Sequence, residues 1–153
     1  MNTTSTDRIE KQVVLRAPRS RVWQALIEAD QFGQWFGVKL ANSFGVGVHV
    51  TGRVTHPGYE HMPFNLTVER MEPERLLSWR WHVLIEPETS LVSEPTTLVE
   101  FRLEDVDGGT LLTVSESGFD AMPAEYRDAA YRGNEGGWSQ QMVSIERYLA
   151  EAV

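Results

Sequence analysis

Apolar and polar residues alternate through most of the middle of the chain. Five segments show this pattern: residues 45–55, 64–69, 77–82, 97–103 and 110–116. Successive side chains of a β-strand point to opposite faces, so this period predicts strands with one apolar face and one wet face. Asp107, Gly108 and Gly109, between the last two segments, are typical of a tight hairpin. The pattern therefore predicts an antiparallel sheet that is covered on one face.

A further strand and two short helices are predicted before this run. Residues 9–15 form the strand, and Pro18 has a φ angle suited to the first turn of the helix that follows. Asp30 is a candidate N-cap for the second helix. The apolar faces of the two helices comprise Val22, Trp23, Ala25, Leu26 and Ile27, then Phe32, Trp35 and Phe36. Two short helices directly after one strand are an uncommon arrangement, so this order of elements limits the topologies that the chain can adopt.

The C-terminal part carries a helical pattern. Pro123 favours the start of one helical segment, and a second segment runs onward from Trp138. Its apolar stripe is Trp138, Met142, Ile145 and Leu149. Gly136 and Gly137 each cost a helix about 1 kcal/mol relative to Ala, which favours a junction between two helices or a close approach at this point. A sheet with one apolar face and a helix with one apolar stripe cover each other, so the predicted fold class is α+β.

Composition adds several exclusions. A chain of 153 residues with 41% hydrophobic residues predicts one domain over residues 9–153, after a disordered tail at residues 1–8. The net charge of −8 argues against nucleic acid as a partner. No apolar run approaches the length of a membrane span, and the polar start lacks the pattern of a signal peptide. With no cysteine in the chain, a cytoplasmic location is the expectation.

Neither a metal nor a cofactor is predicted. The densest group of metal-ligand residue types is His56, Glu60 and His61, in a segment that also contains Pro57 and Gly58. A turn of this kind does not hold its side chains on one face, so an exposed turn at a cavity mouth is the preferred interpretation.

Several short motifs together resemble the helix-grip fold of START-like (SRPBCC, Bet v 1-like) domains. They are residues 17–26 (APRSRVWQAL), 34–36 (QWF), 74–79 (ERLLSW), 116–119 (ESGF) and 137–138 (GW). Within that superfamily the chain is most similar to the branch named for the C-terminal domain of the activator of the Hsp90 ATPase. The resemblance covers residues 9–149 and implies a curved antiparallel sheet wrapped around a long C-terminal helix. The superfamily includes lipid and hormone carriers and polyketide cyclases.

The leading functional hypothesis is binding of a small hydrophobic or aromatic ligand between the sheet and the final helix. Trp79 and Trp81 share one strand face and are bulky for simple packing, although an ordinary core is the alternative. Asn134 and Trp138 sit at the start of the final apolar stripe, where they would reach such a ligand. The predicted ligand-binding residues are Trp35, Phe64, Leu66, Trp79, Trp81, Phe101, Glu116, Asn134 and Trp138.

Glu116 is the candidate for catalysis. Alternation carries it onto the same face as Leu112 and Val114, where a carboxylate needs a cation or hydrogen-bond donors to hold its charge. Arg53 and Arg80 are candidate partners. Glu116 would then act as an acid or base, or orient a polar ligand atom. Alternatively, it lies in water at the end of the strand.

Two further functions stay open. A cyclase or hydrolase would use the same pocket with Glu116 as its acid or base. A protein-interaction module would make the resemblance to the co-chaperone branch literal. The eukaryotic co-chaperone has a further N-terminal domain that contributes to its Hsp90 contacts, so stimulation of Hsp90 is not carried over to this chain. A homodimer is compatible with the sequence.

Overall fold

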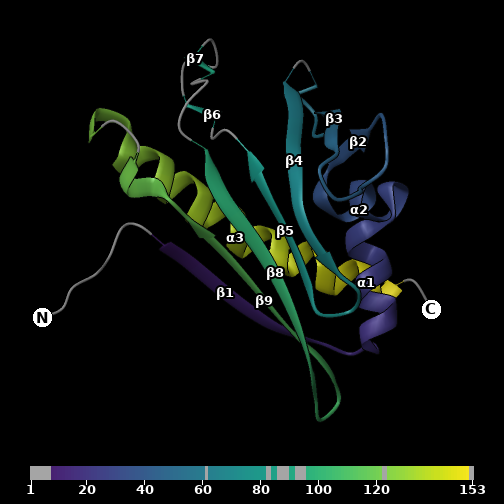
Figure 1. The fold of residues 1–153 in the computed structure, drawn as a ribbon. Helices are drawn as coiled ribbons and strands as arrows, with labels where there is room; N and C mark the ends of the chain where they lie inside the picture. The colour runs from purple at the N-terminus through teal and green to yellow at the C-terminus, as the bar shows by residue number, and fades with distance from the viewer. Residues whose placement is uncertain are drawn as a thin grey trace, which may run out of the picture.

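A seven-stranded antiparallel sheet is the centre of the molecule, in the order β1-β9-β8-β5-β4-β3-β2 (Figure 1). The computed structural model describes residues 8–60, 62–81, 84–85, 90–91, 96–121 and 124–151. The strands are β1 (Arg8–Leu15), β2 (Val38–Leu40), β3 (His49–Val54), β4 (Pro63–Glu72), β5 (Leu76–Trp81), β8 (Thr97–Val106) and β9 (Gly109–Ser117). A separate small pair is formed by β6 (Leu84–Ile85) and β7 (Ser90–Leu91).

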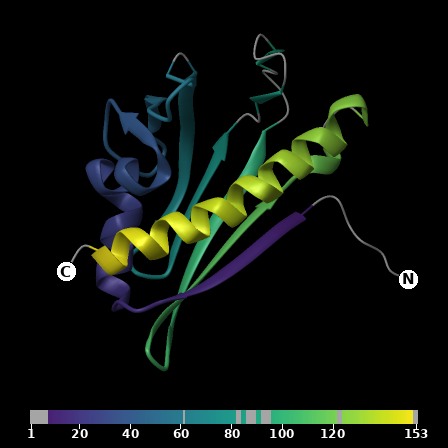
Figure 2. The ribbon, with the colours of Figure 1, turned by 180° about the vertical axis from the view of Figure 1, so that it is seen from behind.

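Two short helices follow β1, and one long helix ends the described chain. They are α1 (Arg19–Ile27), α2 (Ala29–Phe36) and α3 (Ala124–Glu151), with a 3-10 turn, η1 (Phe119–Ala121), before α3. Figure 2 shows α3 lying diagonally across one face of the curved sheet. This arrangement confirms the predicted α+β helix-grip fold. Of the described helices, none is long and apolar enough to span a bilayer.

The prediction of two C-terminal helical segments is wrong. α3 is one continuous helix of 28 residues that runs through Gly133, Gly136 and Gly137. A helix of this length adds one backbone hydrogen bond per residue, and its buried side chains, including Met142 and Ile145, pack against the sheet. These gains offset the cost of the glycines. Pro123, expected at the start of the helix, lies outside the described residues.

Smaller differences concern where elements begin. β1 begins at Arg8, a residue expected in the tail, and residues 1–7 lie outside the described part. Glu28, not Asp30, precedes α2, and Asp30 lies in the first turn of the helix, where its charge complements the helix dipole. β3 starts at His49 because a turn occupies the preceding residues, with Gly47 at a φ of 78°.

The β8–β9 hairpin confirms the predicted turn. Val106 pairs with Gly109, so Asp107 and Gly108 form a two-residue loop. Gly108 has a φ of 88°, which glycine adopts without strain. A Cβ at Gly109 would lie 1.9 Å from the Leu15 carbonyl oxygen, so the hairpin approaches β1 too closely for any larger residue.

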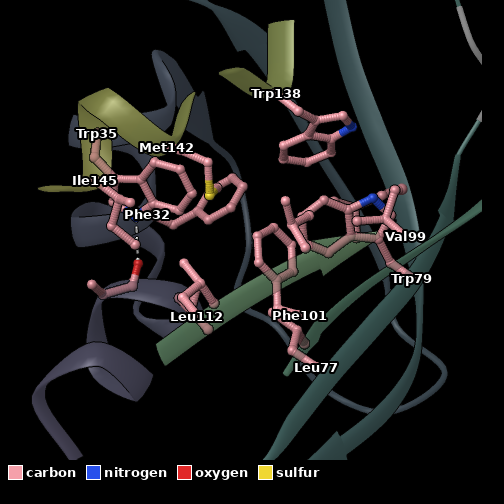
Figure 3. Packing of buried hydrophobic residues seen from close by; sticks show 14 of the residues in the cluster. Phe32, Trp35, Leu77, Trp79, Val99, Phe101, Leu112, Trp138, Met142 and Ile145 are labelled. Atoms are coloured by element: carbon pink, nitrogen blue, oxygen red, sulfur yellow. Dashed lines mark hydrogen bonds between the residues drawn. The ribbon is translucent and has the colours of Figure 1, made fainter. Parts of the chain in front are cut away.

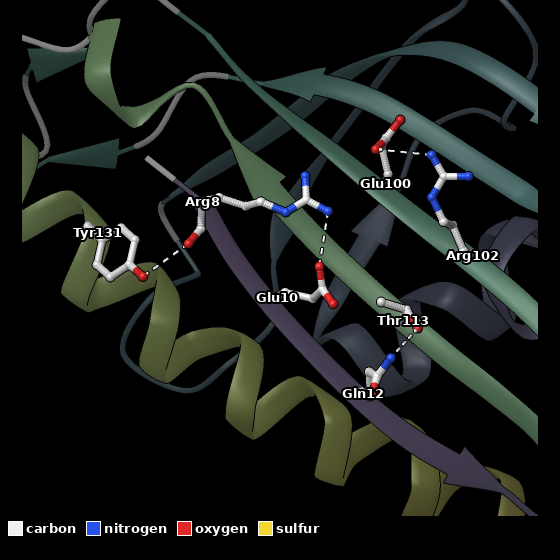
Figure 4. A network of polar contacts seen from close by, with 7 residues as sticks. All are labelled: Arg8, Glu10, Gln12, Glu100, Arg102, Thr113 and Tyr131. Carbon is white, nitrogen blue, oxygen red and sulfur yellow. Dashed lines mark hydrogen bonds and ion pairs between the residues drawn. The ribbon is translucent and has the colours of Figure 1, made fainter. Parts of the chain in front are cut away.

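One face of the sheet is polar. Cross-strand and same-strand pairs cover it, including Gln12 with Thr113 at 3.2 Å and Arg8 with Glu10 at 3.0 Å (Figure 4). At one edge Tyr131 of α3 donates a hydrogen bond to the Arg8 carbonyl oxygen at 3.1 Å. This bond fixes the N-terminal half of α3 against β1.

The other face carries the hydrophobic core under α3 (Figure 3). Met142 and Ile145 of α3 point toward Leu112 and Phe101 of the sheet, and Phe32 of α2 closes one side. Trp35 donates its indole N–H to the Ala25 carbonyl oxygen at 2.8 Å, which ties α2 to α1. The centre of this layer is filled with side chains.

Candidate ligand-binding site

Glu116 lies inside the sheet layer with none of its surface exposed. It pairs with Ile9 of β1 on one side and Val99 of β8 on the other, so strands flank it on both sides. Leu112 and Val114 share its face and are equally buried. The strand-end position in water, considered as the alternative, is therefore excluded.

Four side chains donate hydrogen bonds to the Glu116 carboxylate. The Trp138 indole N–H contacts Oε1 at 2.8 Å, and the Trp81 indole N–H contacts Oε2 at 2.8 Å. The Thr97 hydroxyl lies 2.5 Å from Oε2. The Asn134 amide nitrogen lies 2.9 Å from Oε1 and 3.1 Å from Oε2. Both oxygens are thus held by donors from β5, β8 and α3.

All these donors are uncharged. An indole N–H can only donate, so the set matches an ionised carboxylate. The predicted arginine partners are wrong: in the described part of the chain, neither Arg53 nor Arg80 contacts Glu116, and Arg80 pairs with Glu69 at 3.1 Å on the other face. Within the described residues no lysine, arginine or histidine forms an ion pair with Glu116. The carboxylate is therefore stabilised by hydrogen bonds to neutral groups.

A pocket of about 120 Å³ lies directly in front of this cluster. Its walls are the aromatic rings of Phe36, Trp81 and Trp138, whose centroids are 5.9 to 6.2 Å apart. The described residues that line it are Phe36, Trp81, Gly133, Asn134, Gly137, Trp138 and Gln141. An engineered apolar cavity of about 150 Å³ holds a benzene molecule, so this pocket matches one ring or a small head group.

A larger groove of about 630 Å³ adjoins the pocket and shares Phe36, Trp81 and Gln141 with it. Its other walls are Trp35, Gly37, Val38, Val54, His56, Phe64, Gln140 and Ser144. Pocket and groove together follow the open side of α3 past the end of α2. A ligand larger than one ring has room to extend along this path.

Glycine shapes the helix side of the pocket. Gly133 and Gly137 are four residues apart and so lie on the same face of α3. A Cβ at either position would meet nothing within 4 Å, so no neighbouring side chain requires a glycine there. The space that a side chain would take is left to the pocket.

The predicted ligand-binding residues fall into four groups. Trp81, Asn134 and Trp138 line the pocket, and Trp35 and Phe64 line the groove. Leu66, Trp79 and Phe101 are buried in the core and line neither space. Glu116 lies behind the pocket wall and contacts it only through its donors.

Four residues that line the pocket or contact Glu116 are not predicted as site residues from the sequence. Phe36 occupies a helical position that the sequence pattern assigns to ordinary packing, and Gln141 occupies one that it assigns to the surface. Gly133 stands outside the conspicuous pair of glycines, although its spacing of four from Gly137 is visible in the sequence. Thr97 is the first residue of β8, and a threonine in a strand gives no signal of its own.

The histidine segment contributes one wall residue. His56 lines the groove, and the Glu60 carboxylate accepts a hydrogen bond from the Gly58 backbone N–H at 2.9 Å. His61 lies outside the described residues. The described residues contain no group of three or more potential metal ligands.

Solved structures share this fold at low sequence identity. Protein MLL2253 from Mesorhizobium loti is 20% identical, with a TM-score of 0.77 over 95% of this chain and 98% of that one. The Aha1 dimer from Colwellia psychrerythraea is 18% identical, with a TM-score of 0.69 over 93% and 95%. DynU16, a protein in the dynemicin biosynthetic locus, is 23% identical, with a TM-score of 0.72 over 95% of this chain and 48% of that one.

No functionally curated protein matches the sequence significantly. The family described as activator of Hsp90 ATPase homolog 1-like protein matches residues 16–150. This match spans both short helices, the strands from β2 onward and nearly all of α3. It agrees with the resemblance seen in the motifs, and the chain therefore belongs to the family of activator of Hsp90 ATPase homolog 1-like proteins.

Proposed function

We propose that this protein binds a small apolar or aromatic molecule in the pocket between α3 and β5. The observation that carries the proposal is the pair Gly133 and Gly137 in the middle of a helix. Each glycine costs the helix about 1 kcal/mol relative to Ala, and neither is needed for packing. A bound molecule that contacts the helix backbone at these two positions would explain why the glycines are present despite this cost.

The chemistry of the wall supports an apolar or aromatic ligand. Phe36, Trp81 and Trp138 offer ring surface, and the indole N–H groups of both tryptophans are turned away from the pocket toward Glu116. Burying apolar surface yields about 25 cal/mol per Å², so an aromatic ring that loses about 150 Å² to solvent gains about 4 kcal/mol before entropic costs. A ligand that also enters the groove gains more.

Glu116 serves this function as a positioning residue. Its carboxylate bonds Trp81 of the sheet and both Asn134 and Trp138 of the helix, so it holds the two sides of the pocket in register. A general acid or base must reach the substrate, whereas Glu116 is fully buried and both its oxygens already accept hydrogen bonds. These contacts favour binding over the cyclase or hydrolase alternative.

The interaction-module alternative finds less support. The large apolar side chains exposed in the described residues are Val14, Val46, Tyr59 and Val143, on four separate segments. A docking surface usually requires a contiguous apolar patch. The concave pocket is the more distinctive feature of this surface.

A pair of leucine variants tests the proposal. Gly137→Leu places a side chain in the pocket, while Gly136→Leu adds the same side chain at a neighbouring exposed position that lines neither space. Both changes remove one glycine from the same helix, so their effects on helix propensity match. Binding is followed by tryptophan fluorescence and calorimetry, with a panel of small aromatic compounds.

We expect compounds that bind the wild type to lose at least roughly tenfold in affinity in Gly137→Leu and to keep it in Gly136→Leu, because only the former fills the space. Equal affinities in the two variants would place binding elsewhere. A panel with no binder at all would remove the proposed function.

A further inference from the structure

Both amide side chains on the pocket wall direct their nitrogen to an acceptor within the protein. Asn134 uses its amide nitrogen on Glu116, and Gln141 uses its amide nitrogen on the Phe36 carbonyl oxygen at 2.9 Å. The partners are a carboxylate and a carbonyl, which only accept, so the orientation of both amides is fixed by chemistry. Among the described residues, neither Asn134 Oδ1 nor Gln141 Oε1 receives a hydrogen bond. The pocket thus offers two acceptor oxygens to a ligand.

The aromatic wall is backed by negative charge. The indoles of Trp81 and Trp138 are stacked at an interplanar angle of 30°, and both donate to one buried carboxylate. A carboxylate bonded to an indole N–H pushes electron density toward the ring, which strengthens the attraction of its face for a cation. Because no cationic side chain pairs with Glu116 in the described chain, its charge also acts through the wall.

The described lining carries no positive charge that would oppose this field. Among the described residues that line the pocket, none is a lysine, arginine or histidine. On the β1 side, Lys11 is paired with Glu135 of α3 at 2.6 Å. The net charge of −8 attracts cations to the molecule as a whole.

From these observations we infer that the pocket selects organic cations, in which an ammonium group is attached to an aromatic or alkyl body. This inference rests on the proposed binding function and adds the charge of the ligand to it. The ammonium N–H groups donate to Asn134 Oδ1 and Gln141 Oε1, and the body packs on Trp81, Trp138 and Phe36. Since Gly133 and Gly137 leave the pocket open to solvent, the cation keeps part of its hydration.

An isosteric pair of probes tests the charge directly. Phenethylammonium and propylbenzene have the same shape, with an ammonium group in one where the other has a methyl group. A merely apolar pocket favours propylbenzene, because the ammonium loses hydration on binding. We expect calorimetry at low salt to show phenethylammonium binding at least roughly fivefold more tightly, with 3-phenylpropanoate as the anion that does not bind.

Tighter or equal binding of propylbenzene overturns the inference while leaving the proposed function intact. Failure of both probes, together with failure of the aromatic panel above, removes both. A preference for phenethylammonium that persists in Gly137→Leu also overturns the inference, because the cation would then bind outside the pocket.

Glu116→Gln supplies a readout that a purely structural role would not change. The substitution removes the charge, and any disturbance of the pocket weakens both probes alike. The affinity ratio of phenethylammonium to propylbenzene, measured in the same variant, should therefore fall toward one. An unchanged ratio in the folded variant contradicts a role for the carboxylate. If the variant does not fold, the wild-type ratio alone decides.

Discussion

The two ends of the layer between α3 and the sheet are built from the same residue types and differ in what surrounds them. At the core end, Trp79 is fully buried against Phe32 and Phe101, with ring centroids 5.8 and 5.1 Å away, and its indole N–H has no hydrogen-bond partner among the described residues. At the pocket end, Trp81 and Trp138 both direct their indole N–H groups to Glu116. At the core end, tryptophan fills volume; at the pocket end, hydrogen bonds fix the orientation of the tryptophan rings.

This difference shows that neighbouring residues of one strand serve different roles, one in stability and the other in the proposed binding. Trp79 and Trp81 are neighbours on one face of β5, with ring centroids 5.5 Å apart. Only Trp81 borders the pocket and the groove. The hydrogen bonds to Glu116 fix the rings that a ligand would touch, whereas the core end needs only volume and fit.

The largest expected effect comes from exchanging the two neighbours for alanine. Trp79→Ala should lower the free energy of unfolding by about 4 kcal/mol, because it opens a cavity in a sealed region. Trp81→Ala should cost less stability, since its ring is partly exposed, yet it should weaken binding of aromatic compounds at least roughly tenfold. Urea denaturation and calorimetry on both variants measure the two quantities.

Should Trp79→Ala impair binding more than Trp81→Ala in the folded protein, the division between core and pocket would be wrong. A similar loss of stability in both variants would show that the pocket end is as tightly packed as the core.

The next effect concerns the charge at the pocket end. Glu116→Gln replaces one acceptor oxygen with an NH₂ group that faces donors, so we expect a loss of roughly 2 kcal/mol in the free energy of unfolding. Glu10→Gln is a suitable control, because Glu10 pairs with Arg8 on the exposed face and should cost less than about 0.5 kcal/mol. Equal costs in chemical denaturation would mean that the buried network contributes no more than a surface pair.

The sequence was sufficient to predict the sheet, the two short helices and the apolar stripe of α3, because each depends on a local period. Alternation also placed Glu116 on the inner face. The pattern could not tell that Gly136 and Gly137 lie inside one helix, since the packing that offsets their cost comes from distant strands.

The hydrogen-bond partners of Glu116 could not be predicted from the sequence for a related reason. A buried carboxylate favours an arginine partner, and Arg80 lies in β5 directly before the actual donor, Trp81. A shift of register by one residue decides which of them faces inward. Thr97 and Asn134 reach the same carboxylate from β8 and α3, and no local period predicts where three elements meet.

The smallest effect distinguishes the two kinds of buried indole. Trp138→Phe and Trp79→Phe remove comparable volume from buried positions, so their packing losses should be similar. They differ in one N–H group: Trp138 donates to a buried carboxylate, whereas the N–H of Trp79 finds no acceptor within the part of the chain that the structure describes. Removing a hydrogen bond to a charged group costs more than removing an unsatisfied donor, so Trp138→Phe should be less stable than Trp79→Phe by about 1 to 2 kcal/mol. Urea denaturation with matched slopes measures this difference, and a difference of zero or of opposite sign would show that the carboxylate does not depend on the Trp138 indole.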